Sequence, residues 1–385
     1  MTSSPATAEI RFVLDTIAHI RDLAQHDRFA DASDDVVDAV LEGAGEFARG
    51  VWGPINGIGD RVGARWIDDG VVMPDGYASA YQAYVEGGWG TIGVPVEHGG
   101  QGLPFVLQTA VLELLGTANT GFALCPTLTV GAIEALVHHG SADQQALYLP
   151  QLATGAWTGT MNLTEPQAGS DVGALRAQAF PRGDGTWSIK GTKIYISFGD
   201  HDMAENIVHL VLARTPNAPP GTRGISLFLV PKFRLDAAGK PAEPNDVKVV
   251  SIEHKLGLHA SPTCVLSFGD HDDCIGELIG PEHGGMRAMF TMMNNARHAV
   301  GRAGQVARPH GRRGFIGDEL APRRGVVIGE QRFERNIDDI RIAVEHLAIG
   351  IAELHALDER VHEGVACGVH RVEVKAFEHG EDLQH

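Results

Sequence analysis

The chain has 385 residues, of which 43% are hydrophobic and 21% charged, and this length suits roughly two or three globular domains. Aspartate and glutamate exceed lysine and arginine by 18, so the net field disfavours nucleic acids and anionic membrane surfaces as partners. The four cysteines show no Cys-x-x-Cys spacing, which fits a reducing compartment. The N-terminus lacks a basic start followed by an apolar run, so we expect a cytoplasmic protein without a membrane span.

Residues 1–155 are expected to form an all-α domain. Apolar residues between Ile10 and Ile20 recur every three or four positions, and Ser33 is a candidate N-cap for a helix over residues 34–49. Further helices are predicted over residues 77–86, 104–115, 122–138 and 143–153, separated by glycine-rich breaks.

Residues 156–283 show a period of two, which predicts a β-domain. Strands are predicted over residues 186–197, with a turn at Gly191, and over residues 206–214, 224–230, 247–252 and 263–268. Parallel strands need long return connections, and no helical stretch separates these strands. We therefore expect an antiparallel sandwich or barrel, and an α+β fold for the chain.

Residues 284–385 are the third region. Residues 284–297 return to helical spacing and hold four of the eight methionines. The next 88 residues hold 11 of the 24 arginines and none of the tryptophans, tyrosines or methionines, although residues 337–361 keep a helical period. One hypothesis is that residues 298–385 are translated from a shifted reading frame, and the alternative is a divergent C-terminal domain.

Two stretches carry the strongest chemical signal. Residues 161–173 combine a short strand with a Pro/Gly turn, whose backbone N–H groups and Ser170 suit an anion, although an ordinary turn or helix cap has the same pattern. In residues 193–197, strand alternation predicts that Lys193, Tyr195 and Ser197 share one face. An aromatic ring beside a hydroxyl suits a planar redox ring, and a half-buried strand face is the alternative.

Together these stretches resemble the acyl-CoA dehydrogenase family of flavoproteins, and residues 253–264, 280–286 and 292–297 extend the resemblance in chain order. The similarity spans about residues 10–297 and is nearest to the branch acting on medium to long acyl-CoA, with Asn162 departing from the family's small residue. It implies an N-terminal α-domain, a central β-domain and a C-terminal α-helical bundle, here expected to be truncated or aberrant. FAD would lie between the last two.

The resemblance also implies site residues. Leu163 and Thr164, with Met161 before them, would line the pyrimidine edge of the flavin. Ser170 would lie at the FAD phosphate and the substrate, Tyr195 would cover the ring, and Ser197 would approach the hydride-accepting nitrogen.

On the substrate side, the residues implied to face the acyl-CoA channel are Met293, Asn294 and Arg297. A salt bridge or a helix cap is the alternative role for Arg297. No metal site is expected. Gly-Asp-His-Asp occurs at residues 199–202 and again at 269–272, and we interpret both copies as turns rather than metal ligands.

The implied reaction is α,β-dehydrogenation of acyl-CoA to trans-2-enoyl-CoA, in which a carboxylate removes the α-proton while a hydride passes to flavin N5. The family's glutamate base comes from the C-terminal domain, and none of the tail glutamates can be assigned to that role: Glu345, Glu353, Glu359 and Glu363. The implied partners are acyl-CoA and an electron-transfer flavoprotein, with a homo-oligomer if the bundle is intact. An inactive fragment and an acyl-CoA oxidase are the alternatives.

Overall fold

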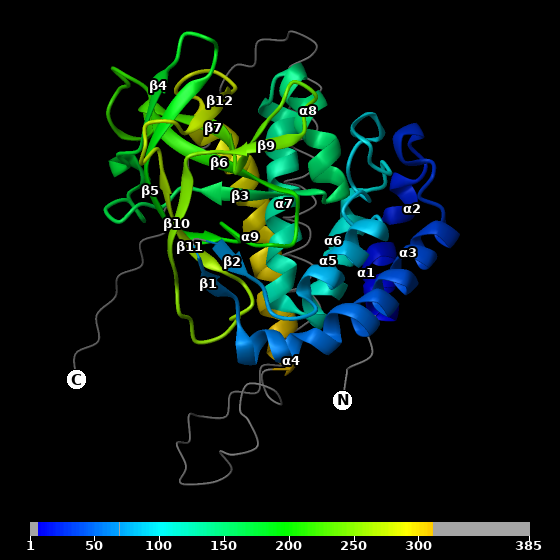
Figure 1. Cartoon of the computed structure of the whole chain (residues 1–385). Helices are drawn as coiled ribbons and strands as arrows, with labels where there is room; N and C mark the ends of the chain where they lie inside the picture. Colours follow the sequence, from blue (N-terminus) through cyan, green and yellow to red (C-terminus); the bar gives the residue numbers. More distant parts are fainter. Residues whose placement is uncertain (1–6, 69, 311–385) are drawn as a thin grey trace, which may run out of the picture. The chain divides into compact units, whose positions relative to one another are not determined.

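The computed structural model describes residues 7–68 and 70–310 (Figure 1). The predictions for the rest of the tail lie outside the described residues. These are the shifted reading frame beyond residue 310, the helical period over residues 337–361 and the unassigned glutamates.

The N-terminal region is mainly helical, as predicted. Its α-helices are α1 (Thr7–Thr16), α2 (Ile20–Leu23), α3 (Asp34–Phe47), α4 (Gly53–Val62), α5 (Tyr77–Glu86), α6 (Phe105–Ala118), α7 (Thr120–His139) and α8 (Ala142–Thr154), with a π-helical turn Ala48–Trp52. Ser33 caps α3, because its side chain accepts a hydrogen bond from the Val36 N–H group at 3.4 Å. The sequence did not reveal the hairpin of β1 (Arg65–Ile67) and β2 (Gly70–Val72), whose strands are too short to show a period.

The β-domain holds the remaining strands: β3 (Trp157–Asn162), β4 (Gln178–Pro181), β5 (Trp187–Ser197), β6 (Asn206–Arg214), β7 (Ile225–Pro231), β8 (Phe233–Leu235), β9 (Pro241–Pro244), β10 (Val247–Ile252), β11 (Thr263–Phe268) and β12 (Ile275–Ile279). The main sheet has the order β10-β11-β5-β12-β7-β6-β3, with β4 beside β5 and β6. Most pairs are antiparallel, as predicted, but β3 and β4 both run parallel to β6. Helix α9 (Gly285–His310) follows the sheet.

Strand β5 is continuous, so the predicted turn at Gly191 is wrong. Gly191 has φ +148°, and a Cβ atom there would lie 2.8 Å from the Cβ of Ala177. The glycine therefore allows close approach of two backbones rather than a chain reversal.

A β-bulge near the end of β5 overturns the predicted common face of Lys193, Tyr195 and Ser197. Two residues of β5 oppose one residue of β11 at this point, and Tyr195 takes φ +61°. The extra residue inverts the alternation of side chains. Lys193 is consequently buried, whereas Tyr195 is 60% exposed and Ser197 is half-buried.

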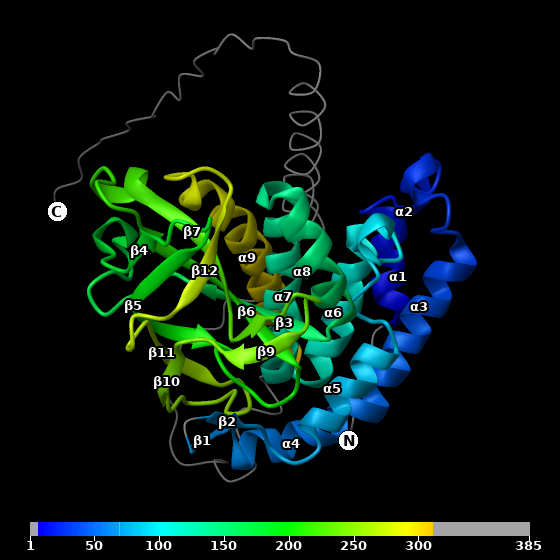
Figure 2. The same cartoon turned by 45° about the horizontal axis from the view of Figure 1, so that its top comes forward.

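Helix α7 packs against the sheet and against its neighbouring helices. It contacts β3, α6, α8 and α9, and Figures 1 and 2 both show it running beside α9. Among the described residues it is also the one helix long and apolar enough to span a membrane, yet 72% of its apolar window is buried inside the protein. Such burial is typical of a core helix.

Gly159 of β3 lets α7 lie directly on the sheet. A Cβ atom at this position would lie 2.4 Å from the Cβ of Ala132, and the Gly159 N–H group donates to the Thr129 side chain at 3.1 Å. The contact positions the strand that leads into residues 161–173.

We predict that Gly159→Ala lowers the free energy of unfolding by about 1–3 kcal/mol, because the added methyl group overpacks the β3–α7 contact. Gly50→Ala is the control, since nothing lies within 4 Å of a Cβ atom there. Urea unfolding of both variants measures the difference. Equal stability of the Gly159 variant and the wild-type chain would contradict this packing.

Candidate functional site

The stretch after β3 lies against the bulge of β5. The Ile194 N–H group donates to the Thr164 carbonyl oxygen at 2.9 Å. This hydrogen bond joins two segments about thirty residues apart in the chain, and we call the contact between Thr164 and Ile194 the junction. Tyr195 is the next residue after it. Both segments were predicted to contribute to one site.

Glu165 and Lys193 form a buried ion pair behind this junction. The Lys193 ammonium donates to Glu165 Oε1 at 2.8 Å and to the Leu163 carbonyl oxygen at 3.1 Å. The Lys193 side chain is 0% exposed and that of Glu165 is 3% exposed. The pair is not predictable from strand alternation, which places Lys193 on the same face as Tyr195, and no motif in the sequence marks Glu165 as its partner.

The Glu165 carboxylate joins the two ends of the loop formed by residues 165–177. It accepts hydrogen bonds from the backbone N–H groups of Arg176 and Ala177 at 2.6 and 3.0 Å, and from the Gln167 side chain at 2.6 Å. With Lys193, four donors surround the two oxygens. Buried carboxylates need such saturation, because an unpaired buried charge is strongly destabilising.

The pKa values of the pair follow from its surroundings. Burial lowers the pKa of Lys193 to about 8, against the opposing effect of the Glu165 carboxylate. Burial acts to raise the pKa of Glu165, but the Lys193 ammonium and the backbone donors together hold it below its ordinary value. Both groups are therefore charged at neutral pH.

Arg214 fixes the far side of the loop. Its guanidinium donates to the carbonyl oxygens of Leu175 and Gly173 in the loop, at 3.0 and 2.5 Å, and to those of Pro219 and Gly221. By contrast, within residues 7–68 and 70–310, no group accepts from the backbone N–H groups at positions 164 and 169–171. A row of open N–H donors suits an anionic or carbonyl-bearing ligand.

The other predicted flavin contacts lie at the end of β3 and on the loop that follows it. Leu163 is buried in the apolar core that the β-domain shares with α7, α8 and α9, and the partly buried Met161 packs against that core. Thr164 is half-buried, and Ser170 is exposed on the loop. Met161, Leu163 and Thr164 therefore lead into the contact with the bulge, and Ser170 lies further along the loop.

The predicted acyl-CoA residues lie on α9. Met293 packs against the same apolar core as Met161, while Asn294 and Arg297 are exposed. Arg297 donates to the Asn294 side chain at 3.0 Å, and its guanidinium lies 5.6 Å from the centre of the Phe290 ring. Among the described residues, no hydrogen bond or ion pair connects Asn294 or Arg297 with the loop or the bulge.

Comparisons with known proteins decide the family. The "Acyl-CoA dehydrogenase, N-terminal domain" matches residues 61–156, and the "Acyl-CoA dehydrogenase, middle domain" matches residues 160–271. The chain is 47% identical over 301 residues to 3-methylmercaptopropionyl-CoA dehydrogenase of Ruegeria pomeroyi, covering 78% of this chain and 51% of that protein. The chain belongs to the acyl-CoA dehydrogenase family.

A second relative agrees with this assignment, and a solved structure shares the fold. A butyryl-CoA dehydrogenase of Syntrophomonas wolfei is 40% identical over 276 residues, covering 69% of this chain and 45% of that protein. The structure of an acyl-CoA dehydrogenase from Bacillus anthracis, complexed with FAD, has a TM-score of 0.57 at 24% identity and covers 72% of this chain and 43% of that chain. This chain thus spans about half the length of the curated relatives it matches.

The face of β3 that points away from α7 carries a row of buried polar side chains. Thr158 contacts the His201 ring at 2.9 Å, and Thr160 contacts the His209 ring at 2.7 Å. The Met203 N–H group donates to His201 Nδ1, so Nε2 of this ring carries the proton and donates to Thr158.

Asn162, which departs from the family pattern, ends the buried row. Its Nδ2 donates to the Thr160 hydroxyl at 2.9 Å, and its Oδ1 has no partner among the described residues. Asn162 therefore adds one hydrogen bond within the buried row, and in the described part of the chain no hydrogen bond joins its side chain to Leu163, Thr164 or Ser170.

The first Gly-Asp-His-Asp copy connects the two regions of the chain. It lies in the bend between β5 and β6, as predicted. Asp200 accepts from the Val71 N–H group at 2.9 Å and pairs with the Lys232 ammonium, and Asp202 accepts from the Met73 N–H group at 3.1 Å. Both carboxylates therefore hold the β1–β2 hairpin rather than a ligand.

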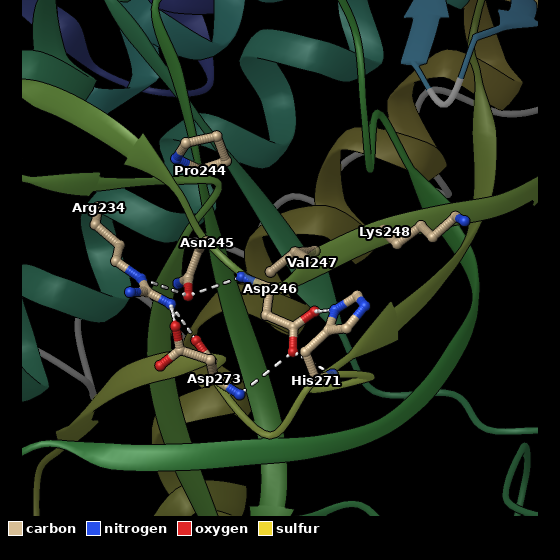
Figure 3. A pocket seen from close by; sticks show the side chains of 8 residues that line it. All are labelled: Arg234, Pro244, Asn245, Asp246, Val247, Lys248, His271 and Asp273. Atoms are coloured by element: carbon tan, nitrogen blue, oxygen red, sulfur yellow. Dashed lines mark hydrogen bonds and ion pairs between the residues drawn. The ribbon is translucent and has the colours of Figure 1, made fainter.

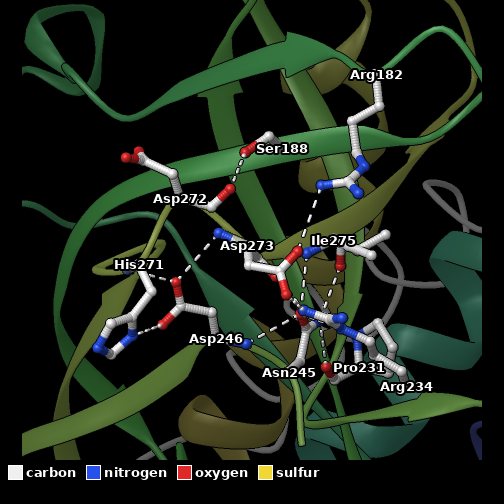
Figure 4. Close-up of polar contacts among 10 residues, drawn as sticks. All are labelled: Arg182, Ser188, Pro231, Arg234, Asn245, Asp246, His271, Asp272, Asp273 and Ile275. Atoms are coloured by element: carbon white, nitrogen blue, oxygen red, sulfur yellow. Dashed lines mark hydrogen bonds and ion pairs between the residues drawn. The ribbon is translucent and has the colours of Figure 1, made fainter. Parts of the chain in front are cut away.

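The second copy borders an open pocket of about 340 Å³ on the β-domain (Figure 3). Asp246 accepts from the backbone N–H groups of His271 and Asp273 and contacts the His271 ring at 3.1 Å. Arg234 pairs with Asp273 at 2.7 Å (Figure 4). These polar groups fix the turn between β11 and β12, as predicted, and in the described part of the chain no cluster of three potential metal ligands occurs.

We predict that stability falls as the pH drops from 6.5 toward 3. Burial lowers the pKa of His201 and of His209 to about 3 from an ordinary value of 6.5, so the unfolded chain binds protons in this range that the folded chain does not. Each histidine should cost about 2 kcal/mol between pH 7 and pH 5.

Urea unfolding at pH 7 and at pH 5 measures this loss. A His201→Gln/His209→Gln variant should lose less stability than the wild-type chain over the same interval, because it lacks both buried imidazoles. An unchanged slope in the double variant would contradict the assignment.

Proposed function

We propose that this chain binds FAD at the junction of Thr164 and Tyr195 and catalyses α,β-dehydrogenation of an acyl-CoA thioester. The hydrogen bond between the Ile194 N–H group and the Thr164 carbonyl carries the proposal, because it unites the two stretches that resemble the family's flavin-binding motifs. Family membership and the FAD of the Bacillus anthracis complex support the cofactor.

The residues present fit a flavin with a phosphate tail. The open N–H groups at position 164 and at positions 169–171 suit the carbonyl oxygens of the ring and the phosphate oxygens, respectively. Ser170 is exposed and available to the same phosphates. The exposed side chain of Tyr195 would cover the ring, and the Ser197 hydroxyl would donate to it.

When bound, FAD supplies the acceptor for a hydride from the β-carbon of the thioester. The protein must also remove the α-proton with a carboxylate. Glu165 is unsuited to that task, because four donors already occupy its two oxygens. In the described part of the chain we assign no base.

The proposal extends to partners and location. The substrate would enter along the face of α9 that bears Met293, Asn294 and Arg297, an electron-transfer flavoprotein would take the electrons, and the chain would act in the cytoplasm. Medium to long acyl groups remain our prediction. Because the relatives' names include butyryl-CoA and 3-methylmercaptopropionyl-CoA, short thioesters belong in the substrate series.

The direct test of the proposal is an optical spectrum of the purified chain, followed by titration with acyl-CoA thioesters of increasing length. We expect a yellow protein with a flavin absorption band that bleaches with at least one thioester. A chain that takes up no FAD on reconstitution would contradict the proposal. Rapid reoxidation by oxygen would favour the oxidase alternative, and bound FAD that no thioester bleaches would favour an inactive fragment.

We predict that Thr164→Val and Ser197→Ala each weaken FAD binding or slow flavin reduction about tenfold, the effect of one lost hydrogen bond. Thr192→Val is the matched control, because Thr192 is an exposed residue of the same strand as Ser197. Fluorescence titration with FAD and stopped-flow reduction measure the two quantities. Wild-type values in both site variants would remove these hydroxyls from the site.

A further inference from the structure

We propose that Glu165 and Lys193 are a positioning pair for the flavin: they hold the Leu163–Thr164 peptide in place and strengthen its N–H group as a donor. The inference rests on the proposed function and adds two residues that never touch the ligand. Three observations support it: the burial of both side chains, the hydrogen bond from Lys193 to Leu163, and the open N–H group of Thr164.

The ion pair first holds the Leu163–Thr164 peptide in position. The Lys193 ammonium reaches both ends of a short backbone stretch, because it bonds the Leu163 carbonyl and the carboxylate of Glu165. On the other side, the Thr164 carbonyl accepts from the Ile194 N–H group. Strand β5 therefore holds this peptide at two points: Lys193 binds the Leu163 carbonyl, and the Ile194 N–H group binds the carbonyl of the next peptide, at Thr164.

The charge of Lys193 also polarises the Leu163–Thr164 peptide. A carbonyl oxygen that accepts from an ammonium group draws electron density through its peptide, and the N–H group of the same peptide becomes a stronger donor. Here that N–H group belongs to Thr164 and has no acceptor among the described residues. A charge fully removed from water is screened least, so the effect is largest at a buried lysine.

The bulge makes this arrangement feasible. Without the extra residue in β5, Lys193 and Tyr195 would share one face, and the ammonium would lie on the side of the aromatic ring. With the extra residue, the Lys193 ammonium is buried against the Leu163 carbonyl, while the Tyr195 side chain is exposed on the other face. The left-handed conformation of Tyr195, with φ +61°, accompanies this inversion.

The same strand offers a matched control pair. Lys190 and Asp272 form an ion pair at 2.7 Å, with side chains 54% and 76% exposed. This pair has the same chemistry and nearly the same length as the buried pair, but it contacts neither Leu163 nor Thr164. Its removal should therefore leave the flavin site unaffected.

The test compares the wild-type chain with Lys193→Met, Glu165→Gln, the double variant of both, and a Lys190→Met/Asp272→Asn control. Each protein is titrated with FAD, the absorption maximum of the bound flavin is recorded, and the melting temperature is measured. Each single variant should melt well below the wild type, because each leaves one buried polar group without its charged partner.

The double variant separates positioning from folding. It should recover most of the melting temperature, since both charges are gone, yet bind FAD about tenfold more weakly and with a shifted absorption maximum, since the ammonium is absent. The control should match the wild-type chain in all three measurements. A double variant with wild-type affinity and an unshifted band would overturn the inference.

If the double variant does not fold, the order of the single variants decides. Glu165→Gln keeps the hydrogen bond from Lys193 to Leu163 and should bind FAD more tightly than Lys193→Met, and the reverse order or equal affinity would overturn the inference. A wild-type chain that binds no FAD overturns the proposed function, and the inference with it. If the wild-type chain binds FAD but the variants do not differ from it as predicted, the inference is overturned and the proposed function is not.

Discussion

The buried carboxylate of Glu165 is the constraint on which the rest of the site depends. A charge in the protein interior must be matched by a counter-charge and by hydrogen bonds, and here the far end of the loop and a lysine from another strand supply them. Because these donors come from separate parts of the chain, satisfying one carboxylate fixes the loop, the end of β3 and the bulge of β5 together.

The surrounding packing serves the same end. Gly159 lets α7 lie on β3, Gly191 lets β5 approach Ala177, and Arg214 binds the carbonyl groups of the loop. The carbonyl groups of Gly173 and Leu175 are thus bound by the protein, while the N–H groups at positions 164 and 169–171 have no acceptor within residues 7–68 and 70–310. N–H groups without an acceptor can donate to carbonyl or phosphate oxygens of a ligand. Because the chain belongs to the acyl-CoA dehydrogenase family, a flavin is the ligand to test.

Much of the fold was predictable because some helices are amphipathic and begin at a recognisable cap, as α3 does at Ser33, and because strands such as Asn206–Arg214 are apolar runs between turn residues. The bulge at Tyr195 was not predictable, because alternation assumes one residue per register step and the sequence carries no mark of the extra one. The error placed Lys193 on the wrong face and concealed its pairing with Glu165, although a lysine beside the apolar end of a strand and a glutamate in a turn were visible signals.

The central claim is that the open N–H groups of the loop receive the flavin. Hydrogen exchange of the backbone amides, followed by mass spectrometry with and without FAD, tests it most directly. We expect peptides that include positions 164 and 169–171 to exchange more slowly once FAD is added, while peptides from the turn at residues 269–273 do not change. Equal exchange of the loop peptides in both states, at saturating FAD, would contradict the account.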